Sequence, residues 1–202
     1  MADSATSAGA AGATSVGAAG AARGADVWTS TRLFMRHPSL AEIPPLPEPP
    51  AGYVLRGYQP VDGSGLAALL TRAFGEAWDE ARVRRDLAET PDVEQIYLIA
   101  YHDKLVATAS ARLLPDEYPG SGYVHWVGAD PAHQGKGLGR LVSLRLLHHF
   151  RAAGLRDAVL ETNGFRLPAV RTYLRLGFVP ERHYGDADEQ RRWSRLLPQI
   201  VR

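Results

Sequence analysis

The sequence QGKGLG at residues 134–139 is the stretch around which the chain is organised. It follows a short apolar run at residues 124–129. Downstream, apolar residues recur at helical spacing: Leu138, Leu141, Val142, Leu146 and Phe150. This spacing predicts a long amphipathic helix with the glycines at its amino-terminal end. Glycines lack Cβ and allow a sharp turn that another molecule can approach closely. Because free N–H groups and the positive end of the helix dipole meet there, the stretch predicts a phosphate-binding loop, to which Lys136 adds a mobile charge.

Two common phosphate-binding patterns do not fit this loop. A P-loop needs glycine six residues before its lysine and Ser or Thr directly after it, but Asp130 and Gly137 occupy these positions. The dinucleotide pattern G-x-G-x-x-G fails at Arg140. The pattern that fits is Q/R-x-x-G-x-G, formed by Gln134, Gly137 and Gly139. On these residues the chain resembles the GNAT superfamily of N-acetyltransferases, whose corresponding loop binds the pyrophosphate of acetyl-CoA. The alternative is a glycine-rich turn between a strand and a helix.

A second signature lies further along the chain. Ala169, Tyr173, Gly177 and Phe178 follow the spacing A-x-x-x-Y-x-x-x-G-F that GNAT proteins show. Ala169 and Tyr173 share one helical face, so the small residue leaves space beside the tyrosine. Since both signatures occur in the right order and at the right separation, the resemblance to the GNAT superfamily extends over residues 53–180.

Composition narrows the classes of function. Lys and Arg total 23 against 22 Asp and Glu, a net charge of +1 that gives no reason to expect nucleic acid as a partner. The absence of cysteine excludes disulfides, thiolate metal sites and a cysteine nucleophile, and no metal is expected. No apolar run approaches the ~20 residues that span a bilayer. A cytoplasmic enzyme with no membrane partner is therefore expected.

The chain divides into three parts on composition. Residues 1–26 are almost entirely Ala, Gly, Ser and Thr and are predicted to be disordered, because such small side chains bury too little surface. Residues 27–52 are predicted to form an extended proline-rich arm, in which residues 28–36 form an added edge strand or dock on the domain. A polyproline ligand is the functional alternative for this arm. Residues 53–202 are predicted to form the GNAT-like domain.

The element order within this domain indicates a mixed α/β fold. Strands are predicted at residues 53–58, 95–101, 105–113, 123–129 and 157–162, with helices carrying residues 66–74, 78–89, 138–150 and 168–177. This order predicts a single GNAT-like mixed sheet flanked by helices. The end departs from the family. A shortened last strand is expected near residues 182–184, followed by a helix at residues 186–197 with Asp186 as its N-cap.

The resemblance also implies roles for individual residues. The strand before the loop would run along the pantetheine arm of acetyl-CoA, and the loop amides would hold its pyrophosphate. The implied co-substrate-binding set is Val127, Gly128, Ala129, Gln134, Gly135, Lys136, Gly137, Leu138, Gly139, Arg140 and Arg166. Arg166 stands where the family often has Asn, and it could contact a phosphate, an acidic acceptor or only solvent. Phe74, Glu76 and Trp78 lie where GNAT folds place residues that line the acceptor site.

Acyl transfer from a thioester to an amine needs a group that protonates the departing thiolate. A thiol has a pKa of about 8.5 and tyrosine one of about 10, so a tyrosine can supply the proton and remain uncharged at neutral pH. The resemblance assigns this general-acid role to Tyr173. A core tyrosine with a satisfied hydroxyl is the structural alternative.

The transfer also needs a neutral amine, whose ordinary pKa is about 10.4. His125 is a candidate base because its ordinary pKa is near 6.5, and by strand periodicity it shares a face with Tyr123 and Val127. Glu161 on the next strand is the second candidate. A structural histidine is the alternative for His125, which leaves the base open.

The sequence therefore predicts an N-acetyltransferase that moves an acetyl group from acetyl-CoA directly to a primary amine of a small molecule or protein. One alternative is a non-catalytic module that binds or senses acyl-CoA. Another is an interaction protein that works through the proline-rich arm. The acceptor, the oligomeric state, with a homodimer as one option, and the role of the segment before residue 53 stay open.

Overall fold

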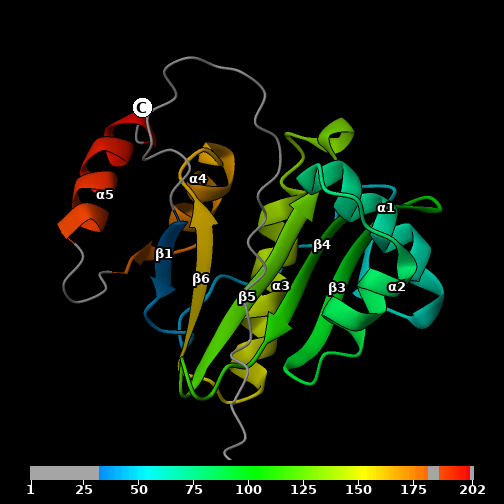
Figure 1. Ribbon diagram of the computed structural model, residues 1–202, viewed down its shortest axis with the longest axis horizontal. Helices are drawn as coiled ribbons and strands as arrows, with labels where there is room; N and C mark the ends of the chain where they lie inside the picture. Colours follow the sequence, from blue (N-terminus) through cyan, green and yellow to red (C-terminus); the bar gives the residue numbers. More distant parts are fainter. Residues whose placement is uncertain (1–31, 182–186, 201–202) are drawn as a thin grey trace, which may run out of the picture.

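A computed structural model describes residues 32–181 and 187–200 of the chain. Three predictions lie outside these residues: the tail at 1–26, the last strand near 182–184 and the N-cap Asp186. The described chain folds around one seven-stranded sheet with helices on both faces (Figure 1). The predicted α/β class with a single mixed sheet flanked by helices is confirmed.

The sheet has the strand order β2-β3-β4-β5-β6-β1-β7. Its strands are β1 (Arg32–His37), β2 (Tyr53–Gly57), β3 (Val93–Tyr101), β4 (Lys104–Arg112), β5 (Ser121–Ala129), β6 (Asp157–Asn163) and β7 (Val179–Pro180). Neighbouring strands are antiparallel except β5 and β6, which run parallel. This one parallel pair lies near the centre of the sheet, and α3 connects its two strands in the chain.

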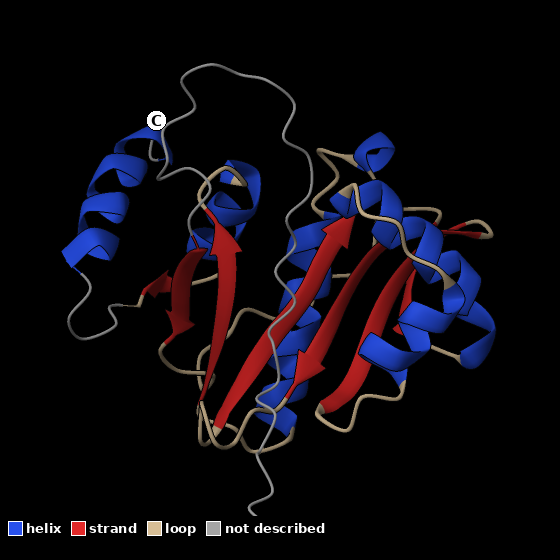
Figure 2. Cartoon of the chain, viewed as in Figure 1, coloured by secondary structure: helices blue, strands red, loops and turns tan. Residues whose placement is uncertain are grey.

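The helices divide between the two faces of the sheet (Figure 2). They are α1 (Gly63–Phe74), α2 (Glu80–Val83), α3 (Leu138–Ala152), α4 (Leu167–Arg175) and α5 (Ala187–Ile200). The apolar residues of α1 and α2 form one buried cluster, and those of α3, α4 and α5 form another on the opposite face. No described helix is both long and apolar enough to span a bilayer.

The apolar periodicity that predicted α3 corresponds to its buried face. Leu141, Val142, Leu146 and Phe150 are at most 4% exposed. Residues three and four apart lie on one side of a helix, so this row of side chains packs on the sheet. The start of α3 is thereby fixed relative to the end of β5.

The predicted boundary at residue 53 is wrong, because β1 is an interior strand of the sheet. It is not the added edge strand that was expected, since it pairs antiparallel with β6 on one side and β7 on the other. Alternate side chains of β1 are buried, with Leu33 at 1% and Met35 at 0% exposure. Two-residue periodicity of this kind places one face of the strand in the core. Residues 32–52 are therefore part of the folded domain.

The proline-rich segment after β1 also packs on the domain. Leu40 and Ile43 are buried in the cluster that includes α3. The amide of Leu40 donates to the carbonyl of Arg156 at 2.9 Å, and His148 on α3 contacts the carbonyl of Pro44 at 2.8 Å. These contacts show that the segment packs on the domain and is not a free connector.

The end of the described chain agrees with the predicted departure from the family. β7 contains only Val179–Pro180, and the predicted terminal helix is present as α5. α5 packs beside α4, with Trp193 and Leu196 buried. In this sheet β1 occupies the position between β6 and the short β7.

Candidate active site

The parallel strands β5 and β6 pair along only part of their length. Their register runs from Ser121 opposite Asp157 to Val124 opposite Leu160. Beyond that point the two strands diverge (Figure 1), while β5 stays paired with β4 as far as Ala129. We call residues 121–124 with 157–160 the paired half, and residues 125–129 with 161–163 the divergent half. In the divergent half, the edge of β5 that faces β6 has no strand partner.

A β-bulge lies at the start of the divergent half. The pairing of β4 with β5 passes from Ser110–His125 to Thr108–Gly128, so β5 holds one extra residue. Trp126 within this step has a positive φ of 45°. A bulge of this kind turns the following side chains to the opposite face.

Because of the bulge, the prediction that His125 and Val127 share one face of β5 is wrong. Val127 packs in the cluster on the α3 side, whereas the ring of Trp126 packs 4.9 Å from Phe74 and 4.8 Å from Trp78 on the α1 side. His125 lies beside Trp126, with ring centroids 5.5 Å apart. His125 and Val127 therefore do not share a face, because the extra residue breaks the two-residue period.

The glycine-rich stretch forms the predicted turn into α3. Gly135 and Gly137 have φ values of 77° and 71°, which side chains with Cβ rarely adopt. A Cβ at Gly135, Gly137 or Gly139 would meet no atom within 4 Å, so the backbone there is open to approach. The helix begins at Leu138, whose buried side chain anchors it. Because α3 starts here, its first amides point outward at the positive end of the helix.

Asp130 fixes the connection between β5 and this turn. Its carboxylate, 2% exposed, accepts hydrogen bonds from Arg72 and Lys104 at 2.9 Å and from the amide of Ala132 at 3.0 Å. Burial alone would raise the pKa of Asp130, but these hydrogen bonds outweigh burial and lower the pKa to about 2. The carboxylate is therefore ionised at neutral pH and joins α1, the β3–β4 turn and the loop.

Tyr173 lies on α4, where it is 6% exposed. Its ring packs edge-on against Phe178 at 5.8 Å between centroids. Burial raises the pKa of the Tyr173 hydroxyl, and the charge of Arg166 acts in the opposite direction. Tyr173 is thus a buried phenol that is protonated at neutral pH, and the positive charge of Arg166 acts on it.

Arg166 is the N-cap residue of α4. Its guanidinium carbon lies 4.7 Å from the centre of the Phe74 ring. Phe74 is the last residue of α1, so this contact joins the segment after β6 to the helix on the other side of β5. Sequence spacing gave no sign of this pairing.

The candidate base His125 is a weaker proton acceptor than its residue type predicts. Burial and the nearby charge of Arg112 lower its pKa to about 3. The Arg112 Nη1 atom lies 3.5 Å from His125 Nε2, and Arg112 is itself paired with Asp92. The imidazole is therefore neutral at physiological pH and has little affinity for a proton.

The second candidate, Glu161, belongs to a polar group on the α1 side of the sheet. Burial raises the pKa of Tyr123, and the charge of Glu161 acts in the same direction. Arg32 on β1 donates to Glu161 at 3.0 Å. Sequence reasoning missed Arg32, because the register of β1 against β6 joins residues that are more than a hundred positions apart.

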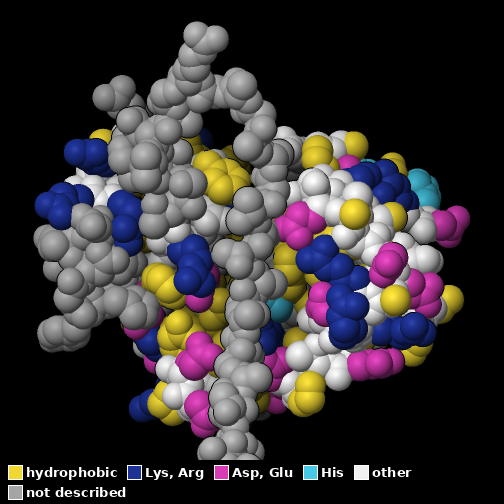
Figure 3. Space-filling view, in the orientation of Figure 1, with side chains coloured by type: hydrophobic (Ala, Val, Ile, Leu, Met, Phe, Trp, Pro, Cys, Tyr) yellow, Lys and Arg dark blue, Asp and Glu magenta, His cyan; other side chains and the backbone are white. Residues whose placement is uncertain are grey.

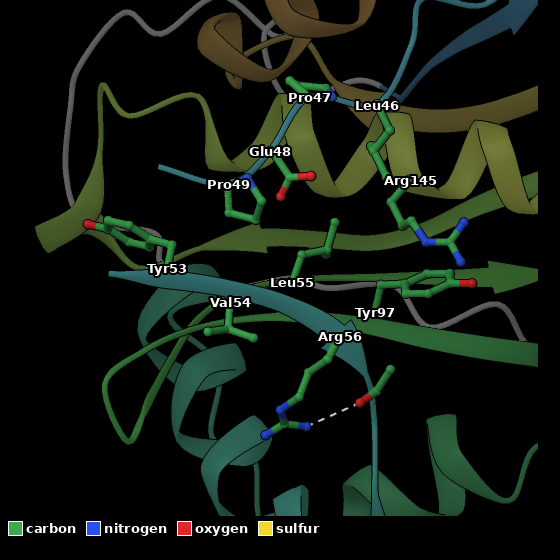
Figure 4. A pocket seen from close by; sticks show the side chains of 11 residues that line it. Leu46, Pro47, Glu48, Pro49, Tyr53, Val54, Leu55, Arg56, Tyr97 and Arg145 are labelled. Atoms are coloured by element: carbon green, nitrogen blue, oxygen red, sulfur yellow. Dashed lines mark hydrogen bonds between the residues drawn. The ribbon is translucent and has the colours of Figure 1, made fainter. Parts of the chain in front are cut away.

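A separate cavity lies at the edge of the sheet, and none of the predicted site residues lines it. It has a volume of about 460 Å³ and lies between the proline-rich segment, β2 and α3 (Figure 4). Arg145 reaches over its floor, where the guanidinium carbon stands 4.4 Å from the centre of the Tyr97 ring. This cavity is therefore separate from the residues that the sequence singled out.

The surface on the α1 side has a mixed character. Among the described side chains on this face, basic and acidic residues are interspersed with apolar ones (Figure 3). No broad field of one sign is visible among them. Such a surface is not of the kind that binds a polyanion by charge alone.

Comparisons with known proteins agree with this arrangement. The sequence profile of the acetyltransferase (GNAT) family matches residues 64–178. The mycothiol acetyltransferase of Nocardia farcinica is 37% identical over 164 residues, which cover 75% of this chain and 54% of that protein. The mycothiol acetyltransferase of Actinosynnema mirum is 36% identical over 147 residues, covering 69% and 48%. The chain thus spans about half the length of these curated relatives.

The fold itself is similar to solved structures. A GCN5-related N-acetyltransferase from Sphaerobacter thermophilus superposes with a TM-score of 0.61 at 22% identity. The match covers 74% of this chain and 48% of that one. At this level of identity the likeness concerns the fold.

Proposed function

The chain belongs to the GNAT family of acetyltransferases, and from this membership we propose that it transfers an acetyl group from acetyl-CoA to a primary amine. GNAT acetyltransferases use acetyl-CoA as co-substrate. The observation that carries the proposal is the divergence of β5 from β6 directly before a glycine turn whose backbone is open to approach. The unpaired edge of β5 is therefore followed along the chain by the amino terminus of α3, and we call these two parts together the path.

The residues of this path suit the parts of acetyl-CoA. Backbone groups of Val127 and Ala129 on the unpaired edge of β5 can hydrogen bond to the amides of the pantetheine arm. The amides of Leu138, Gly139 and Arg140 at the start of α3 can hold the pyrophosphate. The open space at the glycine Cβ positions lets a phosphate reach the backbone. These five residues belong to the larger set that the resemblance implies.

In the proposed reaction Tyr173 acts as the general acid. Bound acetyl-CoA supplies an activated acyl group, which the amine attacks while the carbon–sulfur bond breaks. The Tyr173 hydroxyl donates its proton to the departing thiolate. Burial keeps the phenol protonated beforehand, and the same burial raises the proton affinity of a thiolate beside it. The charge of Arg166 stabilises the phenolate left behind.

For the base we propose Glu161 in preference to His125. An imidazole whose pKa is about 3 holds a proton too weakly to take one from an alkylammonium. Glu161 carries a carboxylate on the α1 side of β6, and Arg32 donates a hydrogen bond to it. In this scheme it accepts the proton of the amine directly or through one water.

The relatives are named mycothiol acetyltransferases, so an amine related to mycothiol is the first acceptor to test. Charges of both signs lie near the divergent half, among them Arg166, Arg32 and Glu161, and such a mixture suits a small polar molecule better than a highly charged polymer.

Two measurements on the purified chain test the proposal. Calorimetry with acetyl-CoA should show binding, and a free-thiol assay with acetyl-CoA and a panel of amines should show amine-dependent turnover. Absence of affinity for both acetyl-CoA and CoA would overturn the proposal. Tight binding with no turnover on any amine would instead indicate a module that binds or senses acyl-CoA.

A further inference from the structure

Arg166 is an unusual cation within the divergent half. Its side chain is half-buried, and its Nε atom is buried without a hydrogen-bond partner. Its aromatic neighbours are Phe74 and Phe165, whose ring centres lie 4.7 and 5.5 Å from the guanidinium carbon. Burial lowers the pKa of Arg166, although arginine stays charged at physiological pH.

No carboxylate neutralises this guanidinium within the described part of the chain. The nearby acid Glu76 contributes to its field but is already paired with Arg82 at 3.0 Å. Taking a guanidinium out of water is costly, and contact with an aromatic face offsets only part of that cost. The five N–H donors of an arginine match a carboxylate in a two-point contact. The side chain is therefore built to receive an anion.

The neighbours of Arg166 indicate which kind of anion it would bind. Its charge acts on the Tyr173 hydroxyl, the proposed proton donor. Its guanidinium lies over Phe74, which itself packs against Trp126 beside the bulge of β5. The contact thus falls on the α1 side of the sheet, and the guanidinium is near enough to the phenol for its charge to act on it. In the proposed reaction, an anion held there would share the acceptor side of the site with the amine.

We infer that Arg166 binds a carboxylate of the acceptor, so that the preferred substrates are small primary amines that carry a carboxylate near the amine, as amino acids do. This inference rests on the proposed acetyltransferase function and names the substrate class of the same site. Phe74 and Trp126 supply an apolar surface for the rest of the molecule. The diphosphate of acetyl-CoA has its own binding groups at the start of α3, which leaves Arg166 for the acceptor.

Matched pairs of an amino acid and its carboxamide test this inference, because each pair differs only in the carboxylate. The kcat/KM of each should be measured with saturating acetyl-CoA over a range of pH, so that the different amine pKa values are accounted for. The wild type should prefer the acids about 10–100-fold, which is typical of discrimination by a charged hydrogen bond. Arg166→Met should bring the acid-to-amide ratio of kcat/KM to about one, while turnover of acids and amides alike falls through the loss of the charge beside Tyr173. Arg166→Lys keeps the charge but loses the two-point geometry and should retain a reduced preference.

Arg175→Met is the matched control, since it removes one exposed arginine from the same helix. It should keep the preference for acids, and thermal unfolding of all three variants checks that they fold. Equal turnover of acids and amides by the wild type would overturn this inference alone. So would an Arg166→Met variant that keeps the preference but binds acetyl-CoA more weakly, since the guanidinium would then serve a phosphate of the co-substrate. Absence of turnover with every amine would remove the proposed function and this inference together.

Discussion

The paired and divergent halves of β5 and β6 belong to the same two strands but are held in place by different interactions. In the paired half, Gly122 leaves room for the ring of Phe150, and Arg36 from β1 reaches Asp157 at 3.0 Å and Glu181 at 2.7 Å. In the divergent half, an extra residue in β5 ends the close approach, and Asp130 fixes the end of the strand. Contacts with distant segments hold the strands of the paired half together. In the divergent half, a bulge separates the strands and the ion pairs of Asp130 fix the end of β5. The comparison separates the residues that maintain the fold from those available for chemistry.

The largest expected effect is on chemistry in the divergent half. Tyr173→Phe removes one hydroxyl and keeps the buried ring, so kcat should fall about 10²–10⁴-fold, the usual contribution of a general acid. The affinity for acetyl-CoA should stay within about twofold. Free-thiol release and calorimetry measure the two quantities.

Tyr97→Phe is the control for that prediction. Tyr97 is also buried, but its hydroxyl contacts His149 at 3.2 Å on the α3 side. This variant should keep its kcat within about twofold. If Tyr173→Phe turns over as fast as the control, the phenol is a core residue and not the proton donor.

A substitution in the paired half should lower the free energy of unfolding. In Gly122→Ala the new Cβ would lie 2.3 Å from Cγ of Phe150, and overpacking of this kind costs about 1–3 kcal/mol in the free energy of unfolding. Chemical denaturation measures the loss. In a Phe150→Leu background the same substitution should cost less, because the ring that it meets is gone. An equal cost in both backgrounds would show that the ring does not set the fit of the two strands.

Residues close in sequence were the ones that could be predicted. The apolar period of α3 and the glycines before it form a local pattern, and so does the helix of Tyr173. Such patterns follow from helix and strand geometry without knowledge of the rest of the chain. The glycine turn was therefore placed correctly with respect to both β5 and α3.

Residues joined across long separations could not be predicted. The insertion of β1 between β6 and β7 depends on pairs such as Phe34 with Glu161, for which the sequence holds no local signal. The bulge at Trp126 shifted the faces of β5 by one residue, so the periodic rule failed at Val127. The low pKa of His125 depends on burial and on Arg112, neither of which its residue type reveals.

A smaller effect is expected where Asp130 fixes the end of the divergent half. Asp130→Asn loses a charged hydrogen-bond acceptor for Arg72 and Lys104, and the free energy of unfolding at pH 7 should fall by about 1–2 kcal/mol. The pKa of Asp130 is about 2 in the folded chain against an ordinary 3.8, so its ionisation stabilises the fold above pH 3.8. This contribution is lost as the pH falls through 2. Denaturation of both proteins at several pH values should therefore show a difference that shrinks in this window, and a constant difference would contradict the ion-pair account.

The smallest effect is the one expected at Gly139, which we compare with Gly137 in the same glycine turn because the two differ in one respect. A Cβ at Gly137 or Gly139 meets no atom within 4 Å, but only Gly137 has a positive φ. Gly137→Ala should lower the free energy of unfolding by about 1–2 kcal/mol through backbone strain. Gly139→Ala should raise it by up to about 1 kcal/mol, because alanine is favoured in a helix. Both new methyl groups occupy the space where the pyrophosphate would lie, so calorimetry should show weaker binding of acetyl-CoA in both variants. A Gly139→Ala protein that is more stable and binds acetyl-CoA as tightly as the wild type would place the pyrophosphate elsewhere, and the divergent half would then lose its assigned ligand.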